Sequence, residues 1–258
     1  QIVYYISAYC DLLAQGAVTE GEPVNFCVPT GNFGNILSAF YAKEMGLPIG
    51  RLLCASNSNN VLTDFIATGK YDRNRPFYNT VSPSMDILIS SNLERLLYLL
   101  SGGDDKLVAG YMKELSDTGC YQVSGEMLEK IQSVFVGGFS SEAETEATIG
   151  KMMDEHKYLI DTHTAVAFHV LEQYRKDTGD QTKTVVASTA SPFKFCDAVL
   201  DALHVTEKAT GTALLDQLAD VSGMPAPQPL ATLKDKKVRF TSWTEKEQMR
   251  AVVTDFLK

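Results

Sequence analysis

A short polar stretch, Thr30-Gly31-Asn32-Phe33-Gly34-Asn35, has residue types that could bind an anion. It follows the apolar run 24–29 and precedes the apolar run 36–41, so the pattern predicts a strand, a tight loop and a helix. N–H groups at a helix start, together with the helix dipole, favour a phosphate. Neither a Gly-Lys-Ser/Thr ending nor G-x-G-x-x-G spacing is present. An ordinary turn, with glycines needed only for backbone geometry, explains these residues equally well, and the residues alone leave both interpretations open.

Two further stretches hold polar groups that could contact a ligand. In S-T-A-S-P-F-K-F (188–195), neutral hydroxyls could bond a heteroaromatic nitrogen or a small anion. Ser191 precedes a proline and fits a helix N-cap, which leaves Thr189 as the better polar contact. In D-T-H-T, Asp161 and His163 could form a hydrogen-bonded pair, although a histidine at a helix start is often structural. No metal-ligand spacing and no nucleophile elbow is visible, so no metal is expected.

A parallel sheet is predicted to position these candidates. Strand, helix and strand follow one another within about 30 residues, which requires parallel pairing and a right-handed crossover. Ligands of open α/β sheets bind at the carboxyl edge, where the loop 30–35 and Thr189 should both lie. Residues 69–82 read as an irregular surface loop and residues 84–100 as one helix. The predicted core strands are 24–28, 51–55, 133–138 and 184–188.

Composition narrows the class of protein. The chain has 258 residues and is 45% hydrophobic, enough for one large domain with a buried core. The net charge of −9 and the pI of about 5.0 argue against nucleic acid as a partner, because that contact needs clustered Lys and Arg. No apolar run reaches the roughly 18 residues that span a bilayer, and no signal peptide is visible, so no membrane contact is expected. Five widely spaced cysteines are typical of reduced thiols in a cytoplasmic protein.

The stretch V-P-T-G-N-F-G-N closely resembles threonine synthases, pyridoxal-phosphate (PLP) enzymes of the tryptophan-synthase-β-like fold, fold type II. Other segments similar to the family, in the family's order, are N-T-V-S-P-S-M-D-I-L-I-S-S-N-L-E-R-L-L-Y, F-x-G-G-F-S-S-E, D-T-H-T-A-V-A and S-T-A-S-P-F-K-F. The resemblance implies that the Thr189 hydroxyl bonds the pyridine nitrogen of PLP. It implies that the PLP phosphate is bound by Thr30, Gly31, Asn32, Phe33, Gly34 and Asn35. It gives weaker indications of substrate contacts by Asn32, Lys194, Asp161 and His163.

The resemblance also implies a reaction of threonine biosynthesis, in which a carbon–oxygen lyase converts O-phosphohomoserine and water to threonine and phosphate. In the family, a Schiff-base lysine in an N-terminal motif resembling F-K-D moves the protons. No lysine precedes Val24 in this chain, so no catalytic residue is expected here and the chain alone should be inactive. Its expected partners are O-phosphohomoserine and a missing N-terminal segment of the same protein.

The expected organisation is therefore the C-terminal portion of a threonine synthase. Residues 1–204 would form most of the large α/β domain of a fold type II enzyme, incomplete at its N-terminal side, with a parallel sheet flanked by helices. Residues 205–258 would form a helical extension that packs on this domain. Two alternatives stay open: a non-catalytic module of the same fold that binds PLP or another phosphate ligand, and a sibling PLP lyase such as cysteate synthase or a dehydratase.

Overall fold

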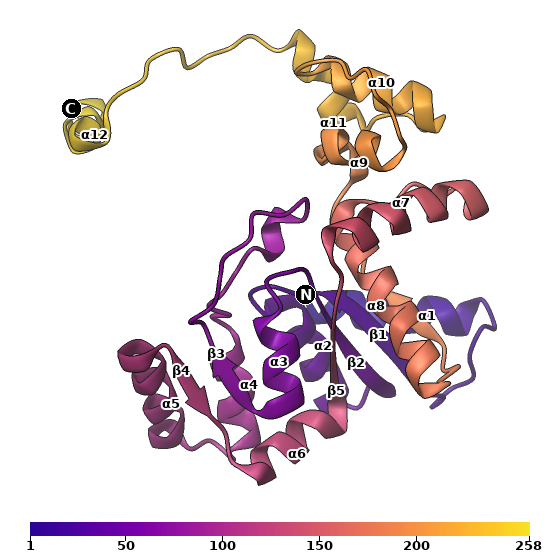
Figure 1. The fold of residues 1–258 in the computed structure, drawn as a ribbon, viewed down its shortest axis with the longest axis vertical. Coiled ribbons are helices and arrows are strands. Elements are labelled where there is room, and N and C mark those ends of the chain that lie inside the picture. The colour runs from indigo at the N-terminus through magenta and orange to yellow at the C-terminus, as the bar shows by residue number, and fades with distance from the viewer.

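The computed structural model describes residues 1–258 and is built around four parallel strands in the order β5-β2-β1-β6 (Figure 1). β1 is central, and Cys27 pairs with Leu53 of β2 on one side and with Val186 of β6 on the other. The predicted parallel α/β sheet is confirmed, and the strand ends lie within two residues of those predicted. The strands are β1 (Val24–Pro29), β2 (Ile49–Ser56), β5 (Phe135–Phe139) and β6 (Thr184–Val186).

Side chains alternate along the central strands and so supply two hydrophobic layers, one on each face. Phe26 and Val28 join the larger layer with the helices α1 (Ile2–Ala14) and α2 (Gly34–Glu44). Cys27 joins the opposite layer, where α8 (Thr162–Thr178) packs on the sheet. The remaining longer helices are α3 (Val61–Thr68), α4 (Leu93–Leu100), α5 (Asp105–Thr118), α6 (Gly125–Val134), α7 (Glu142–His156), α9 (Cys196–Ala202), α10 (Ala213–Ser222) and α12 (Met249–Phe256).

Two glycines of β5 allow helices to approach the sheet closely from both faces. A Cβ atom on Gly137 would lie 2.9 Å from Thr63 Cα on α3. A Cβ atom on Gly138 would lie 2.6 Å from a methyl carbon of Val170 on α8. Both distances are shorter than real Cβ contacts, so the two helices can lie this close to β5 only because residues 137 and 138 have no side chain.

The prediction of an irregular loop over 69–82 is wrong at its start. Residues Lys70–Asp72 form β3, which pairs antiparallel with β4 (Cys120–Gln122) in a separate two-stranded sheet. The rings of Tyr71 and Tyr121 stack across this pair with centroids 5.3 Å apart. Strands of three residues are too short for the alternation of buried and exposed side chains to be recognised. The two paired strands also lie far apart in the sequence.

The prediction of a single helix over 84–100 is also wrong in its first half. The chain forms the 3-10 turn η1 (Pro83–Met85), continues without regular structure, and becomes helical only at α4. The carboxylate of Asp86 accepts a hydrogen bond from Asn57 Nδ2 (2.8 Å), in the loop after β2. Contacts of this kind with distant residues replace the helical hydrogen bonds that the apolar spacing had suggested.

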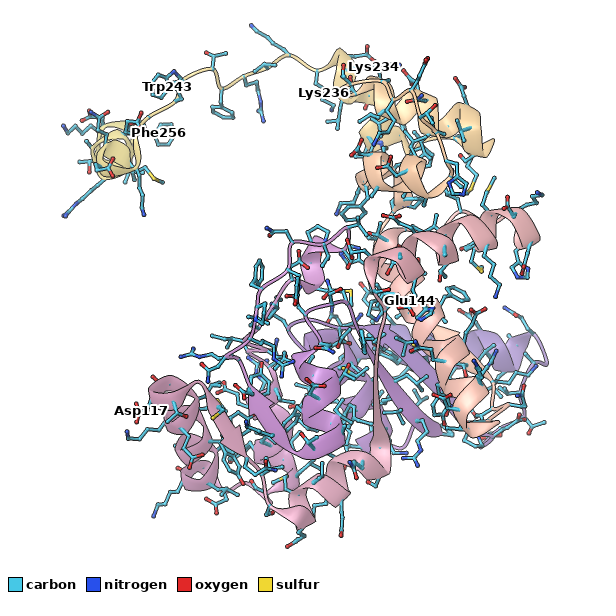
Figure 2. The ribbon with its side chains drawn as sticks, in the orientation of Figure 1. Asp117, Glu144, Lys234, Lys236, Trp243 and Phe256 are labelled. Atoms are coloured by element: carbon cyan, nitrogen blue, oxygen red, sulfur yellow. The ribbon has the colours of Figure 1, made fainter.

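The last part of the chain divides into a packed section and an arm. Helices α9 and α10 and the short α11 (Gln228–Ala231) share a hydrophobic cluster with α7. Beyond the 3-10 turn η3 (Thr232–Asp235), no residue of 236–258 is buried. The arm runs away from the body and ends in α12, and Figure 2 shows Trp243 and Phe256 on it. Trp243 is 84% exposed and does not anchor the terminal helix by packing. No helix of the chain combines the length and the apolar character needed to cross a bilayer.

Candidate functional site: an anion cup at the carboxyl edge of the sheet

The loop between β1 and α2 is held in place by hydrogen bonds and by one buried ring. Thr30 donates its N–H to Ala55 O (2.8 Å) and its hydroxyl to Val28 O (2.7 Å), so that hydroxyl proton is not free for a ligand. Phe33 has φ of 64°, a left-handed conformation that residues other than glycine rarely adopt. Its buried ring packs on Phe135 with centroids 5.4 Å apart, which holds the backbone in this conformation.

The backbone N–H groups from Gly31 to Ile36 donate no hydrogen bond within the protein. Helix α2 begins at Gly34, and its N-cap residue Phe33 has no side-chain acceptor for them. N–H groups at a helix start carry partial positive charge and require acceptors from outside the helix. An anion that contacts several of them would meet this requirement, and we call residues 31–36 the anion cup.

Residues 31–35 of the anion cup line a cavity of about 700 Å³. The other walls come from α1, from η1, from the end of β6 and from the first turn of α8. The cavity therefore brings together the predicted residues 30–35, Thr189 and His163, which are far apart in the sequence. No lysine is among the lining residues.

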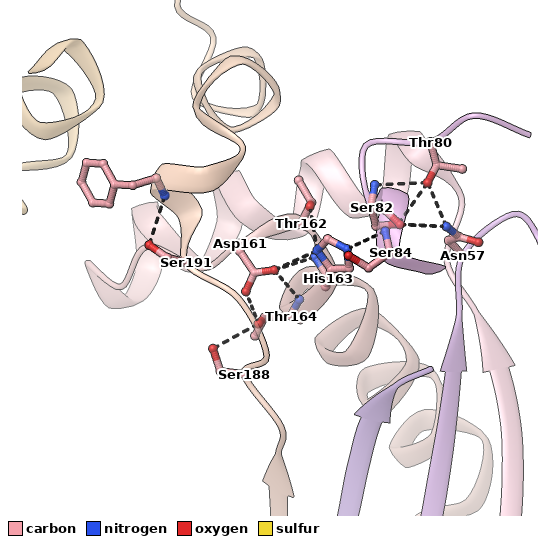
Figure 3. A network of polar contacts seen from close by, with 11 residues as sticks. Asn57, Thr80, Ser82, Ser84, Asp161, Thr162, His163, Thr164, Ser188 and Ser191 are labelled. Carbon is pink, nitrogen blue, oxygen red and sulfur yellow. Dashed lines mark hydrogen bonds and ion pairs between the residues drawn. The ribbon is translucent and has the colours of Figure 1, made fainter. Parts of the chain in front are cut away.

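Thr189 also lines this cavity, just after β6, and the residue is exposed. A polar chain fixes the strand end beside it (Figure 3). The hydroxyl of Thr164 contacts the Ser188 hydroxyl (3.2 Å) and donates to the carboxylate of Asp161. The position of Thr189 is thus set by the first turn of α8 as well as by the sheet.

Asp161 and His163 form the predicted pair, but both have structural partners. Asp161 caps α8 by accepting from the backbone N–H of His163 (2.9 Å). His163 Nδ1 lies 3.2 Å from Asp161 Oδ1, and His163 Nε2 accepts from the Ser84 N–H (3.2 Å), as Figure 3 shows. Since Nε2 is an acceptor, the ring proton must be on Nδ1, directed at the carboxylate. Burial raises the pKa of Asp161, but hydrogen bonds from His163 and Thr164 outweigh it and leave that pKa below its usual range.

Comparison with known proteins gives consistent matches. A family model described as "Threonine synthase, C-terminal" matches residues 164–253. Threonine synthase-like 1 of Homo sapiens is 44% identical over 87% of this chain and 30% of that protein. Threonine synthase of Saccharomyces cerevisiae is 36% identical over 92% of this chain and 48% of its own length. The structure of PLP-bound threonine synthase from Brucella melitensis matches with a TM-score of 0.81 and 35% identity, over 99% of this chain and 49% of that one. The chain is homologous to the C-terminal half of threonine synthases.

The threonine synthase from yeast matches with a TM-score of 0.82 and 32% identity, over 99% of this chain and 52% of that structure. This chain thus spans about half the length of the threonine synthases that it matches. The resemblance and the fold class inferred from motifs are confirmed by these matches.

Lys194 is separated from the other candidate residues. It is exposed in the 3-10 turn η2 (Pro192–Lys194) and lines a second cavity of about 600 Å³, which shares no residue with the first. The neighbouring Ser191 accepts a hydrogen bond from the N–H of Phe193 (3.3 Å), so its predicted role as a cap is confirmed.

Four residues beside the anion cup escaped the sequence reasoning. Tyr5 of α1 and the segment Ser90-Ser91-Asn92 before α4 donate hydrogen bonds to oxygens of Gly31, Asn32 and Asn35. The available signal was the run of three small polar residues inside the predicted helix, because such runs mark turns and caps. For Tyr5 the sequence held no signal beyond its helical spacing.

Proposed function

We propose that this chain is the cofactor-binding part of a threonine synthase and that the anion cup binds the phosphate of PLP. The observation that carries the proposal is the set of N–H groups from Gly31 to Ile36, which have no partner in the protein. Packing favours a backbone site, because a Cβ on Gly31 would come within 3.1 Å of Ser84 O and of Met85 Cα. The loop therefore approaches its neighbours closely and offers N–H groups rather than side chains to the ligand.

Thr189, which lines the same cavity after the end of β6, would bond the pyridine nitrogen. A neutral hydroxyl does not protonate that nitrogen as a carboxylic acid would, so it moderates electron withdrawal by the ring. When bound, PLP supplies the electron sink that the proton transfers of the reaction need. His163 would wall the cavity and hold η1 through Ser84, rather than exchange protons, because both its ring nitrogens have protein partners.

The complete enzyme would make threonine, as the names of its matched relatives suggest. We propose that it does so from O-phosphohomoserine and water, with release of phosphate. Chemistry on PLP requires a lysine amine, and no lysine lines this cavity. We infer that the lysine is supplied by a part of the protein outside residues 1–258. Purified alone with added PLP, the chain should release no phosphate from O-phosphohomoserine, and measurable turnover would contradict this inference.

Calorimetric titration of this chain tests the binding proposal. Pyridoxine 5′-phosphate is the suitable probe, because it keeps the ring and phosphate of PLP but has no aldehyde to react with surface lysines. Unphosphorylated pyridoxine is the matched control ligand. The proposal predicts saturable binding of the phosphate ester and much weaker binding of pyridoxine. Equal affinity for both ligands, or binding of neither, would reject the anion cup as a phosphate site.

The absence of a cavity lysine also favours a second candidate, a module that binds PLP or another phosphate ligand without catalysis. The coding sequence upstream of Gln1 separates the two. A lysine in a motif similar to F-K-D supports the enzyme, whereas a start codon directly before Gln1 supports the module. A sibling lyase of the same fold is distinguished by assaying the complete protein for phosphate release from O-phosphohomoserine.

A further inference from the structure

We propose that Tyr5, Ser90, Ser91 and Asn92 are positioning residues that occupy the oxygens of the anion cup, so that it offers only donors and selects a doubly ionised phosphate ester. This inference rests on the proposed phosphate site and adds the ionisation state that the site recognises. It assigns a role to α1 and to the segment 86–92, which the proposed function leaves without one.

The first half of the cup is held by the segment before α4. Ser90 Oγ donates to Gly31 O (2.8 Å). The Asn92 backbone N–H (3.1 Å) and Nδ2 (2.9 Å) both donate to Asn32 O. Ser91 Oγ lies 3.4 Å from Asn32 Oδ1, as a donor. With its oxygen engaged, the Asn32 amide has its NH₂ group left to donate.

The second half is held by α1 and α2. The Tyr5 hydroxyl donates to Asn35 Oδ1 (2.8 Å), and Ser38 Oγ donates to Asn35 O (2.6 Å). Burial raises the pKa of Tyr5, so its hydroxyl keeps its proton at neutral pH and remains a donor. The Asn35 Nδ2 group has no partner in the protein and is left to donate, like the neighbouring N–H groups.

The segment that holds the cup is itself anchored in a core. The N–H of Ser90 donates to the Tyr71 hydroxyl (2.7 Å), and that hydroxyl donates to Leu88 O (3.0 Å). Tyr71 is 1% exposed and stacks on Tyr121 in the two-stranded sheet. The segment that holds the oxygens of the cup is therefore itself hydrogen-bonded to a buried tyrosine.

A cup whose oxygens already accept hydrogen bonds from the protein offers its ligand no acceptor of its own, so a phosphate monoanion would find none there for its P–OH group. A phosphate ester has a second pKa of about 6, so its affinity should fall as the pH drops below that value. Sulfate carries no proton in this range and serves as the reference anion. The other titratable groups on the surrounding elements are the terminal amine of Gln1, Tyr4, Tyr5, Asp86, Asp161 and His163, and binding of sulfate measures their effect separately.

The first experiment titrates the whole chain with pyridoxine 5′-phosphate, pyridoxine and sulfate at about pH 8 and about pH 5, on either side of the second phosphate pKa. Pyridoxine corrects for ionisation of the ring. We expect the affinity for the phosphate ester to fall about tenfold at the lower pH relative to pyridoxine and relative to sulfate. An unchanged ratio would overturn donor-only recognition. Loss of phosphate-ester binding at both pH values would instead reject the proposed function.

The second experiment tests the positioning residues with matched controls. Tyr5→Phe removes the donor to Asn35, whereas Tyr9→Phe removes a hydroxyl from the same helix that donates to Glu22 O (3.1 Å), away from the cup. Asn92→Ala is matched by Asn74→Ala, since Asn74 Nδ2 donates to Thr118 O (2.8 Å) elsewhere.

We expect Tyr5→Phe and Asn92→Ala to lower the affinity for pyridoxine 5′-phosphate by about three- to tenfold, the usual effect of one hydrogen bond, without lowering the affinity for pyridoxine. The controls should keep the native ratio of the two affinities. Equal losses for both ligands, or a ratio unchanged from that of the controls, would show a structural role only and overturn the assignment.

Discussion

Phe33 makes two opposing contributions to the stability of the folded chain, one through its ring and one through its backbone. Its buried ring stabilises the loop, and its left-handed backbone costs free energy that glycine would not lose. Removing a buried Phe side chain costs about 3–5 kcal/mol. We therefore expect both Phe33→Ala and Phe33→Gly to unfold at lower urea concentration. The glycine variant should be the more stable of the two by about 1 kcal/mol, because it relieves the backbone. Equal stabilities would mean that the left-handed conformation carries no cost.

Asp161 gives a pH dependence whose sign follows from its lowered pKa. In the unfolded chain this carboxyl has a pKa of about 3.9, so the unfolded chain binds the proton at a higher pH than the folded chain does. Its contribution to stability is therefore present above that value and is lost as the pH falls through the folded pKa. Asp161→Asn keeps an N-cap side chain without the charge, and should lower the free energy of unfolding at neutral pH by about 1–3 kcal/mol.

Urea unfolding of wild type and Asp161→Asn between neutral and acidic pH measures this dependence. The two stabilities should converge below about pH 4. A gap that stays constant with pH would contradict the assignment of a charged cap.

At the scale of elements, α8 meets the sheet at Gly138, where there is no room for a methyl group. Gly138→Ala should destabilise the chain by about 1–3 kcal/mol through overpacking against Val170. Val170→Ala creates space at the same point, so the double variant should be more stable than the sum of the single effects predicts. Thermal unfolding of the four proteins gives the coupling energy. Strict additivity would show that the two residues do not compete for this space.

The sequence predicts well those parts of the fold whose structure is determined by the residues of the segment itself. The strands around Val28 and Val185 are apolar and β-branched, and the loop 30–35 carries its own glycines and asparagines. The course of residues 86–92 depends instead on partners such as Gly31 and Asn57, which are distant in sequence. The same limit applied to Lys194, for which the family resemblance implied a substrate contact: only the folded backbone shows that it lines a different cavity from Thr189.

At the scale of the whole molecule, the chain combines a packed body with an exposed C-terminal arm (Figures 1 and 2). Trp243 is the only tryptophan, and it lies on the arm with 84% of its surface exposed. Its fluorescence should therefore resemble that of free indole in water and be quenched readily by acrylamide. Deleting residues 236–258 should leave binding of pyridoxine 5′-phosphate unchanged. A blue-shifted, protected emission would show that the arm packs on another surface in solution.

The central claim is that backbone N–H groups of residues 31–36 bind the phosphate of the cofactor. Amide proton and nitrogen chemical shifts, followed by NMR during titration with pyridoxine 5′-phosphate, test it most directly. Hydrogen bonding to phosphate should move the amide proton signals from Gly31 to Ile36 downfield, with the Asn32 and Asn35 side-chain amides, and pyridoxine should leave them in place. Saturating phosphate ester with these signals unmoved, or shifts confined to another surface, would contradict the account.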